Sequence, residues 1–345
     1  MAGSTPASRC ADPAGDAAEP AARAAGSAGS AGGPTRDAAE PARSLAEPAA
    51  VAPVSISPAR ETWRRFRRHR LAMASTVVLL VLVLAVIVGP WIWPLAINDI
   101  DFTARLVMPT AAHPLGTDDL GQDLLARMLY GGRISLAVGL AAMIVATVFG
   151  VLIGALAGMS RGWLDTALSW ITDLFLSLPE LPLLLLVIYL FREQLKAVFG
   201  VEGGVFVLIV IVIGGLRWMP VARLVRAQIL SLREKEFVEA ARSAGATRWQ
   251  QVTQHILPNA IGPVIVASTI EVSAAIIAES TLSFLGLGFP PDIPTWGRLL
   301  FDAKDHLDVA PHWALFPGAA IFLTVLSINF IGDGLRDALD PRRVI

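Results

Sequence analysis

Two long runs of the sequence contain no Asp, Glu, Lys or Arg. They span residues 71–98 and 134–160, and each is longer than the roughly 20 residues that an α-helix needs to cross a bilayer core. The composition agrees, since 54% of the 345 residues are hydrophobic and only 17% are charged, which is less charge than a soluble domain usually carries. We therefore predict that both runs are transmembrane helices.

Four further stretches extend this pattern. Residues 313–331 contain no charged residue, whereas isolated charged residues interrupt or border residues 163–191, 203–221 and 259–285. Such charges do not forbid a membrane helix, because an ionisable group in a bundle can face protein or a water-filled cavity. The sequence thus predicts an all-α, polytopic membrane protein with six transmembrane helices.

Basic residues predict the orientation, because cytoplasmic loops carry an excess of Lys and Arg. The segment RETWRRFRRHR places six Arg before the first run, residues 217–258 hold seven Lys or Arg, and the C-terminal RDALDPRR holds three. With six spans these segments fall on one side. We expect a multi-pass protein with both termini in the cytoplasm.

Residues 1–58 have a different composition. Ala, Gly, Pro and Ser dominate, and no aromatic residue precedes Trp63, so this part cannot bury a core and is predicted to be a disordered cytoplasmic tail. The formal net charge of −1 argues against binding to nucleic acid. A single cysteine, Cys10, excludes a disulfide framework or a cysteine metal cluster.

A polar stretch lies between the fourth and fifth spans. Residues 231–245 (SLREKEFVEAARSAG) predict a helix with a capping box of Ser231 and Glu234. Gly245 would end this helix in the left-handed conformation. A second helix would then run to Leu257.

The second helix should begin with a capping box of Thr247 and Gln250, and Pro258 would close it or begin the next span. The first helix carries small residues on one face, Ala240, Ala241 and Ala244 among them, and this face allows close approach of another protein's backbone. Glu239 beside it could pair with a cation. The alternative is an amphipathic helix lying on the inner membrane surface.

Between the first two spans, residues 118–130 show an apolar stripe. They predict an outer interfacial helix capped by Thr117 and ended by Gly131 and Gly132. Its role would be a structural collar or a contact with another protein, either external or a partner subunit, and the residues alone leave both open.

Polar side chains within the spans are candidates for lining a water-filled path. They are Asp173, Glu271, Glu279 and Asn329. Glu271 and Glu279 share one face of the fifth span, and that face must avoid lipid. Lining a wet path and forming a hydrogen-bonded clamp between spans are the two interpretations.

No pattern in the sequence indicates an enzyme. The five His lie in loops without ligand spacing, and no phosphate-binding loop of the GxxxxGK(S/T) type occurs. We expect no catalytic residue, no metal site and no cofactor.

The polar stretch also carries a resemblance. The residues EAA, the glycine that follows them and HILPN resemble the EAA signature of binding-protein-dependent ABC transporter permeases. In that family this loop forms a coupling helix, which sits in a cleft of the ATP-hydrolysing subunit and passes its closure to the membrane helices. The resemblance implies an ATPase-coupling site at Glu239, Ala240, Ala241, Gly245 and Pro258.

Three further segments narrow the resemblance to the C-type subunit of the dipeptide, oligopeptide and nickel permeases. They are HPLGTDDLGQDLLARMLYGGRISLAVGL, AESTLSFLGLGFPPDIPTWGRLL and LFPGAAIFLTVLSINFIGDGLRDALDPR. The resemblance covers residues 61–343 and departs at Gln122, where the family more often has Arg. It implies an inner-membrane permease subunit for peptides or, alternatively, nickel chelates. Its partners would be a homologous B-type permease, two ATP-binding subunits, an external solute-binding protein and membrane lipid.

These expectations divide the chain into three parts. Residues 1–58 would be the tail, residues 59–133 an N-terminal region with the first transmembrane helix and the outer interfacial helix, and residues 134–345 the permease transmembrane domain. An ion-driven secondary transporter is a competing hypothesis, but it would show inverted repeats with matching broken helices, and the sequence has no such symmetry. For a non-transporting scaffold the EAA loop has no obvious use.

Overall fold

The computed structural model describes residues 58–339, and apart from one isolated bridge this part of the chain contains helices and no strand. The α-helices are α1 (Pro58–Arg68), α2 (Arg70–Ile92), α3 (Leu124–Met159), α4 (Trp163–Ser177), α5 (Glu180–Gly215), α6 (Trp218–Leu232), α7 (Glu236–Ser243), α8 (Arg248–Gln250), α9 (Leu257–Phe284), α10 (Trp296–Ala303) and α11 (Pro311–Leu339). A π-helical turn, η2 (Gln251–Ile256), joins α8 to α9, and η1 (Phe102–Ala104) and η3 (Lys304–His306) are short 3-10 turns. Except for Pro58, the predicted disordered tail lies outside the described residues.

Within residues 58–339, five helical runs are long and apolar enough to cross a membrane by length and composition. They are α2, α3, α5, the run from α8 through α9, and α11. The prediction of an all-α, polytopic membrane protein is therefore confirmed. The predicted boundaries of the third and fourth spans, in contrast, need correction.

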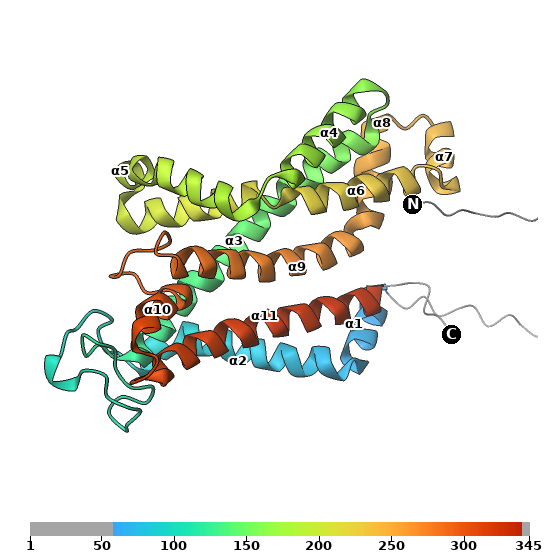
Figure 1. The fold of residues 1–345 in the computed structure, drawn as a ribbon. Coiled ribbons are helices and arrows are strands. Elements are labelled where there is room, and N and C mark those ends of the chain that lie inside the picture. Colours follow the sequence, from blue (N-terminus) through green and yellow to red (C-terminus); the bar gives the residue numbers. More distant parts are fainter. Residues whose placement is uncertain (1–57, 340–345) are drawn as a thin grey trace, which may run out of the picture. The chain divides into compact units, whose positions relative to one another are not determined.

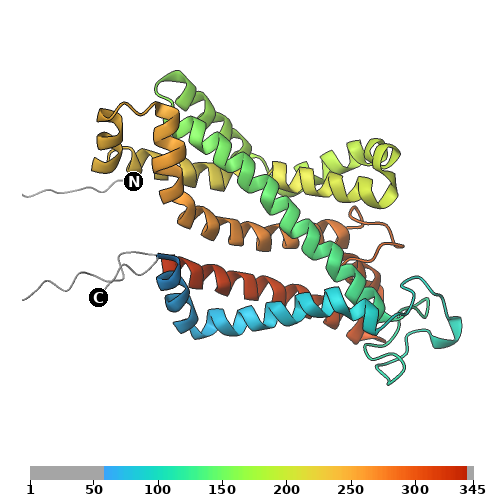
Figure 2. The same ribbon diagram turned by 180° about the vertical axis from the view of Figure 1, so that it is seen from behind.

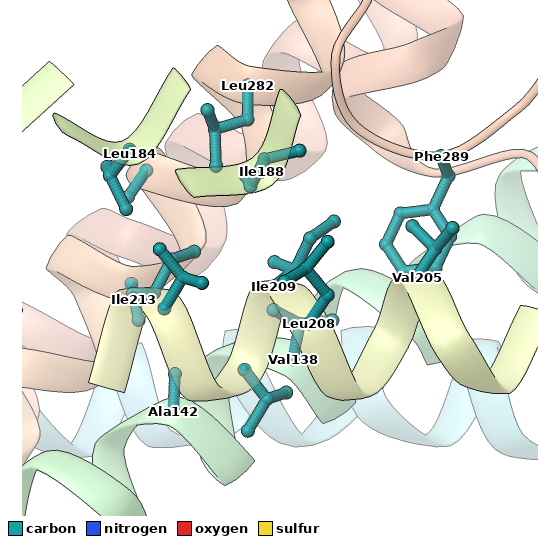
Figure 3. Close-up of a cluster of buried hydrophobic side chains, with 14 of the residues drawn as sticks. Val138, Ala142, Leu184, Ile188, Val205, Leu208, Ile209, Ile213, Leu282 and Phe289 are labelled. Carbon is teal, nitrogen blue, oxygen red and sulfur yellow. The ribbon is translucent and has the colours of Figure 1, made fainter. Parts of the chain in front are cut away.

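The helix α5 contains a reversal of the chain. Gly200 has a φ of 77°, and a Cβ built on Gly204 would lie 2.5 Å from the carbonyl oxygen of Leu195, so the residues on either side of the turn are in close contact. Figure 3 shows Leu184 and Ile188, which precede the turn, packed near residues of the half that follows it. Counted as two passes, α5 brings the described residues to the six passes that the sequence predicts.

Two of these passes are broken helices. The span predicted at residues 163–191 consists of α4 and the first part of α5, because Pro179 lacks an amide hydrogen and disfavours helical geometry in the preceding residue. The span predicted at residues 203–221 consists of the second part of α5 and the start of α6, and Arg217 separates them with a φ of −124° and a ψ of 10°.

The outer interfacial helix predicted for residues 118–130 does not exist as a separate element. The second span begins at Leu124 with Asp123 as its N-cap, and it continues through the two glycines that were expected to end the shorter helix. Both glycines are buried, because Gly131 lies against the backbone at Thr295 and Gly132 against Trp296. The predicted boundary at residue 133 thus falls inside α3.

The outer segment before α3 is held by a buried ion pair. Arg127 donates to Asp118 at 2.8 Å, and its guanidinium also reaches the carbonyl oxygen of Pro291 at 3.1 Å. Burial raises the pKa of the Asp118 carboxyl, and the adjacent Arg127 offsets part of that rise. Thr117 does not cap a helix but bonds the backbone of Ala104 and Val107 instead.

Close packing of α3 on α6 organises the bundle. Gly150, Gly154 and Gly158 recur every four residues on α3, and a Cβ on any of them would lie 2.5–2.8 Å from atoms of α6. Small residues at this spacing let two membrane helices approach at backbone distance. Figure 1 shows α9 between the α5–α6 layer and the pair α2 and α11, and Figure 2 shows α3 crossing them from the other side. At one end of the helices lie α1 and α7, and at the other lie α10 and the loop before α3.

Candidate functional site

The first part of the site is the short helix α7, which projects from the end of the bundle (Figure 1). Lys235 is its N-cap, so the predicted capping box of Ser231 and Glu234 is not formed, and Ser231 lies within α6 instead. One side chain, Val238, is buried, and it packs against α6 and η2 in a cluster that includes Ile229 and Val252.

A glycine turn ends α7 as the sequence predicts. Gly245 has a φ of +89°, its amide donates to the carbonyl of Arg242, and the amide of Ala246 donates to the carbonyl of Ala241, both at 3.0 Å. These two bonds form the Schellman arrangement that satisfies the last carbonyls of a helix. The predicted left-handed turn is confirmed.

The second helix begins as predicted but does not end where it was expected to end. Thr247 and Gln250 form a capping box, and the helical run then continues through η2 into α9 without a break at Leu257 or Pro258. The π-helical turn lies just before Pro258, which has no amide hydrogen to donate, and the side chain of Asn259 bonds the carbonyl of His255 at 2.6 Å. Of the two roles considered for Pro258, beginning the next span is the one observed.

The face of α7 that points away from the bundle is open. Phe237 is 42% exposed, Ala240 and Ala244 are exposed, and Ala241 is half-buried. Glu239 is exposed beside this face and lies 3.8 Å from Arg242. Such a surface combines one aromatic ring with small side chains, so another protein's backbone can approach closely.

The second part of the site lies where the two broken spans meet. Arg217, between α5 and α6, donates from Nη1 to Glu180 at 2.6 Å and from Nε to Glu271 at 2.9 Å. Glu180 is the first residue of α5, and Glu271 lies on α9. We call these three residues the Arg217 triad.

Two more ion pairs continue from the Arg217 triad along α6. Arg223 donates to Asp173 at 2.6 Å, and Arg226 donates to both oxygens of Asp165 at 2.7 and 3.0 Å. Both acidic partners lie on α4. With the Arg217–Glu180 pair they form what we call the inner ion-pair seam. Three of its side chains, Asp173, Arg223 and Arg226, line a cavity of about 340 Å³.

The four predicted path residues are therefore placed differently from one another. Asp173 belongs to the inner ion-pair seam, and Glu271 lies beside it as the second carboxylate bonded to Arg217. Glu279 is fully buried and accepts hydrogen bonds from Ser283 at 2.8 Å and Ser135 at 3.2 Å, so it joins α9 to α3. Asn329 is exposed on α11, and its side chain makes no hydrogen bond to a described residue.

Sequence reasoning missed the arginines of the seam. Arg217, Arg223 and Arg226 were counted as charges of a cytoplasmic loop, whereas each lies at or within a broken span and bonds a carboxylate. The signal available was the recurrence of Arg within an otherwise apolar stretch. Among the described residues, no group of three or more His, Cys, Asp or Glu side chains is arranged to hold a metal ion.

Comparison with known proteins agrees with this arrangement of a membrane bundle and an exposed loop helix. Residues 150–345 match the model of the family described as binding-protein-dependent transport system inner membrane component. This chain belongs to that permease family. Residues 57–109 of the permease also match a model described as the N-terminal TM domain of oligopeptide transport permease C.

Three curated relatives of the permease extend over most of its length. It is 40% identical to the oligopeptide transport system permease protein OppC of Haemophilus influenzae, over 81% of this chain and 87% of that protein. It is 38% identical to the glutathione transport system permease protein GsiD of Pectobacterium atrosepticum (83% and 92%) and 37% identical to the dipeptide transport system permease protein DppC of Alkalihalophilus pseudofirmus (84% and 91%). The permease is thus a multi-pass inner-membrane transport component, and its family is not an enzyme family.

Proposed function

We propose that this permease is the C-type subunit of an ATP-driven importer and forms half of a translocation path for peptides. The observation that carries the proposal is that relatives named for oligopeptide, glutathione and dipeptide transport each match more than four-fifths of the chain. These three kinds of solute share peptide bonds and charged termini. The inner ion-pair seam supports the proposal, because such solutes need a polar surface within the membrane.

The proposed partners follow from this role. A homologous B-type permease would supply the other half of the path, and two ATP-binding subunits would dock at the loop helices. An external solute-binding protein would meet the opposite face of the bundle. In this arrangement α7 and both termini lie in the cytoplasm, as the basic residues predict.

We further propose that α7 is the coupling helix, with Glu239, Ala240, Ala241, Gly245 and Pro258 as the residues of the coupling site. Ala240 and Ala241 would contact the ATP-binding subunit, and Glu239 would pair with one of its cations. Gly245 and Pro258 would instead set the position of α7, because Gly245 fixes the end of that helix and Pro258 lies where the helical run from α8 becomes the fifth span. The exposed face of α7 and its single buried anchor, Val238, support this role.

We propose that the inner ion-pair seam, which includes Asp173, lines the translocation path within the membrane. The carboxylate of Glu271 would line it as well. Asp173 and its partner Arg223 are 60% and 57% exposed, on the helices α4 and α6 that we take to continue the broken spans. Charged groups at such positions do not face lipid, because the cost of placing them there is several kcal/mol. For Glu279 the enclosing hydroxyl groups support the clamp between α3 and α9.

Uptake measurements test the transport function. Proteoliposomes containing this permease, the B-type subunit and the ATP-binding subunits should take up oligo-alanine peptides when the external protein and ATP are supplied. Omission of the ATP-binding subunits should abolish uptake. Uptake of nickel chelates but not of peptides, or uptake driven by an ion gradient without those subunits, would contradict the proposal.

A pair of substitutions at one position of α7 tests the coupling helix. Ala241→Trp places a large side chain on the face proposed to contact the ATP-binding subunit, whereas Ala241→Ser changes the same position with little added volume. Purified complexes of the first variant should lose those subunits or hydrolyse ATP without uptake. The second variant should keep both. Equal behaviour of the two variants would show that this face is not the coupling surface.

A further inference from the structure

The three residues of the Arg217 triad fall within the predicted third, fourth and fifth spans. From the triad, the 15 residues of α6 lead toward the end where α7 lies, and residues 201–215 lead back to the turn at Gly200. At a rise of 1.5 Å per residue, each path is about 22 Å long. The Arg217 triad is therefore far from both chain reversals, at the point where two helices end and two begin.

The three members differ in exposure. Glu271 is 6% exposed and Arg217 is 21% exposed, whereas Glu180 is 42% exposed. A half-exposed carboxylate at this depth cannot face lipid without a large cost. It must face a water-filled path or a polar group of the partner permease, and of the three members Glu180 is the one that a solute can reach.

A small cavity adjoins the exposed carboxylate. Its volume is about 100 Å³, and Glu180 and Arg217 are its charged lining residues, beside apolar side chains from Phe175, Leu183 and Met219. Ligand sites combine an apolar wall with a few convergent polar groups, but they usually measure roughly 300–1,000 Å³. This smaller cavity could therefore hold one end of a peptide but not a whole peptide.

The charges of the Arg217 triad do not balance. One guanidinium is bonded to two carboxylates, which gives a formal charge of −1 when both are ionised, and within the described residues only Arg217 bonds Glu180. That excess favours a cation that can donate hydrogen bonds. Every unmodified linear peptide carries such a cation at its N-terminus, whatever its side chains are.

We propose that Glu180 receives the α-ammonium group of a peptide during its passage, with the adjacent apolar wall contacting the first residue. This inference rests on the proposed peptide transport and names the chemical group that is recognised. Recognition of a group common to all peptides gives the membrane path a binding site without sequence preference. Selection among peptides is then left to the external protein.

The test combines one substitution in the protein with one chemical change in the solute, in the manner of a double-mutant cycle. Purified permease–ATPase complex without the external protein is equilibrated with radiolabelled tri-alanine or N-acetyl-tri-alanine, and binding is measured for the wild type and Glu180→Gln. Glu180→Gln should weaken binding of tri-alanine about tenfold or more, which corresponds to about 1.4 kcal/mol for a lost charge-assisted hydrogen bond. Acetylation should weaken binding to the wild type by a similar factor and should have no further effect in the variant.

Matched variants guard against an indirect effect. Glu193→Gln, on the same helix but 79% exposed and paired with Lys196, should bind both peptides like the wild type. Glu180→Asp should keep the preference for the free amine. Equal loss of both peptides in Glu180→Gln, equal wild-type binding of both, or no measurable binding would overturn the inference while ATP-dependent peptide uptake still stands. Absence of peptide uptake by the complete wild-type system would instead overturn the proposed function, and this inference with it.

Discussion

Replacement of Gly245 tests how the end of α7 is held. Because nothing lies within 4 Å of a Cβ built at Gly245, an added side chain would meet no steric obstacle. Its cost is confined to the backbone, whose φ of +89° an L-residue resists by about 1–2 kcal/mol, with a β-branched residue worst. Gly245→Val should therefore destabilise the turn by about this amount and weaken the two Schellman hydrogen bonds.

This cost is large for so short a helix. An isolated helix of eight residues is unstable in water, and Val238 is the one buried residue that α7 has. A loss of 1–2 kcal/mol lowers the ratio of ordered to disordered states about 5- to 30-fold. Hydrogen–deuterium exchange over residues 236–246 should accelerate by that factor, and ATP hydrolysis should no longer be matched by uptake.

Gly245→Asn is the control, because Asn adopts the left-handed conformation far more readily than Val. It should exchange at nearly the wild-type rate and remain coupled. Both variants leave the apolar spans untouched, so the amount of protein in the membrane should not change. Slow exchange in Gly245→Val, or equal acceleration in both variants, would refute the argument that the positive φ holds α7 in place.

Three other predictions concern packing, the spans and orientation. Gly154→Ala should lower the thermal unfolding midpoint in detergent, because its Cβ would lie 2.5 Å from a carbonyl oxygen of α6 and overpacking costs about 1–3 kcal/mol. Gly318→Ala should not lower it, because the nearest atom to its Cβ would lie 3.9 Å away, and equal midpoints for the two variants would contradict the packing argument. Glu271→Gln should reduce uptake while the amount of folded protein stays normal. Glu279→Gln should instead reduce the amount of folded protein, since Glu279 accepts hydrogen bonds from serines of two helices, and the opposite pattern would exchange their roles. A topology reporter inserted at Ala246 should read cytoplasmic, and an external signal there would exclude the proposed orientation.

Local and compositional signals determined the class of the protein and the turn at the loop. Long uncharged runs predict membrane helices because few polar groups are tolerated in hydrocarbon. The glycine at 245 and the Thr247–Gln250 capping box were predicted correctly because each depends on residues within a few positions of one another. The capping box of Ser231 and Glu234 failed although its spacing was right, since the apolar face of α6 continues past Ser231 and packing extends that helix.

Tertiary structure decided what the polar residues within the spans do. Arg217 and Glu180 are 37 residues apart and Arg223 and Asp173 are 50 apart, so no local pattern pairs them, and a count of basic residues places these arginines in a loop. Contacts distant in sequence also decided that residues 124–130 belong to α3 and not to a separate helix. Gly131, which would end a free helix, instead lets α3 approach the backbone near Thr295. Hydrophobicity is summed along the chain and can be read there, whereas ion pairs and close glycine contacts exist only once distant segments are packed together.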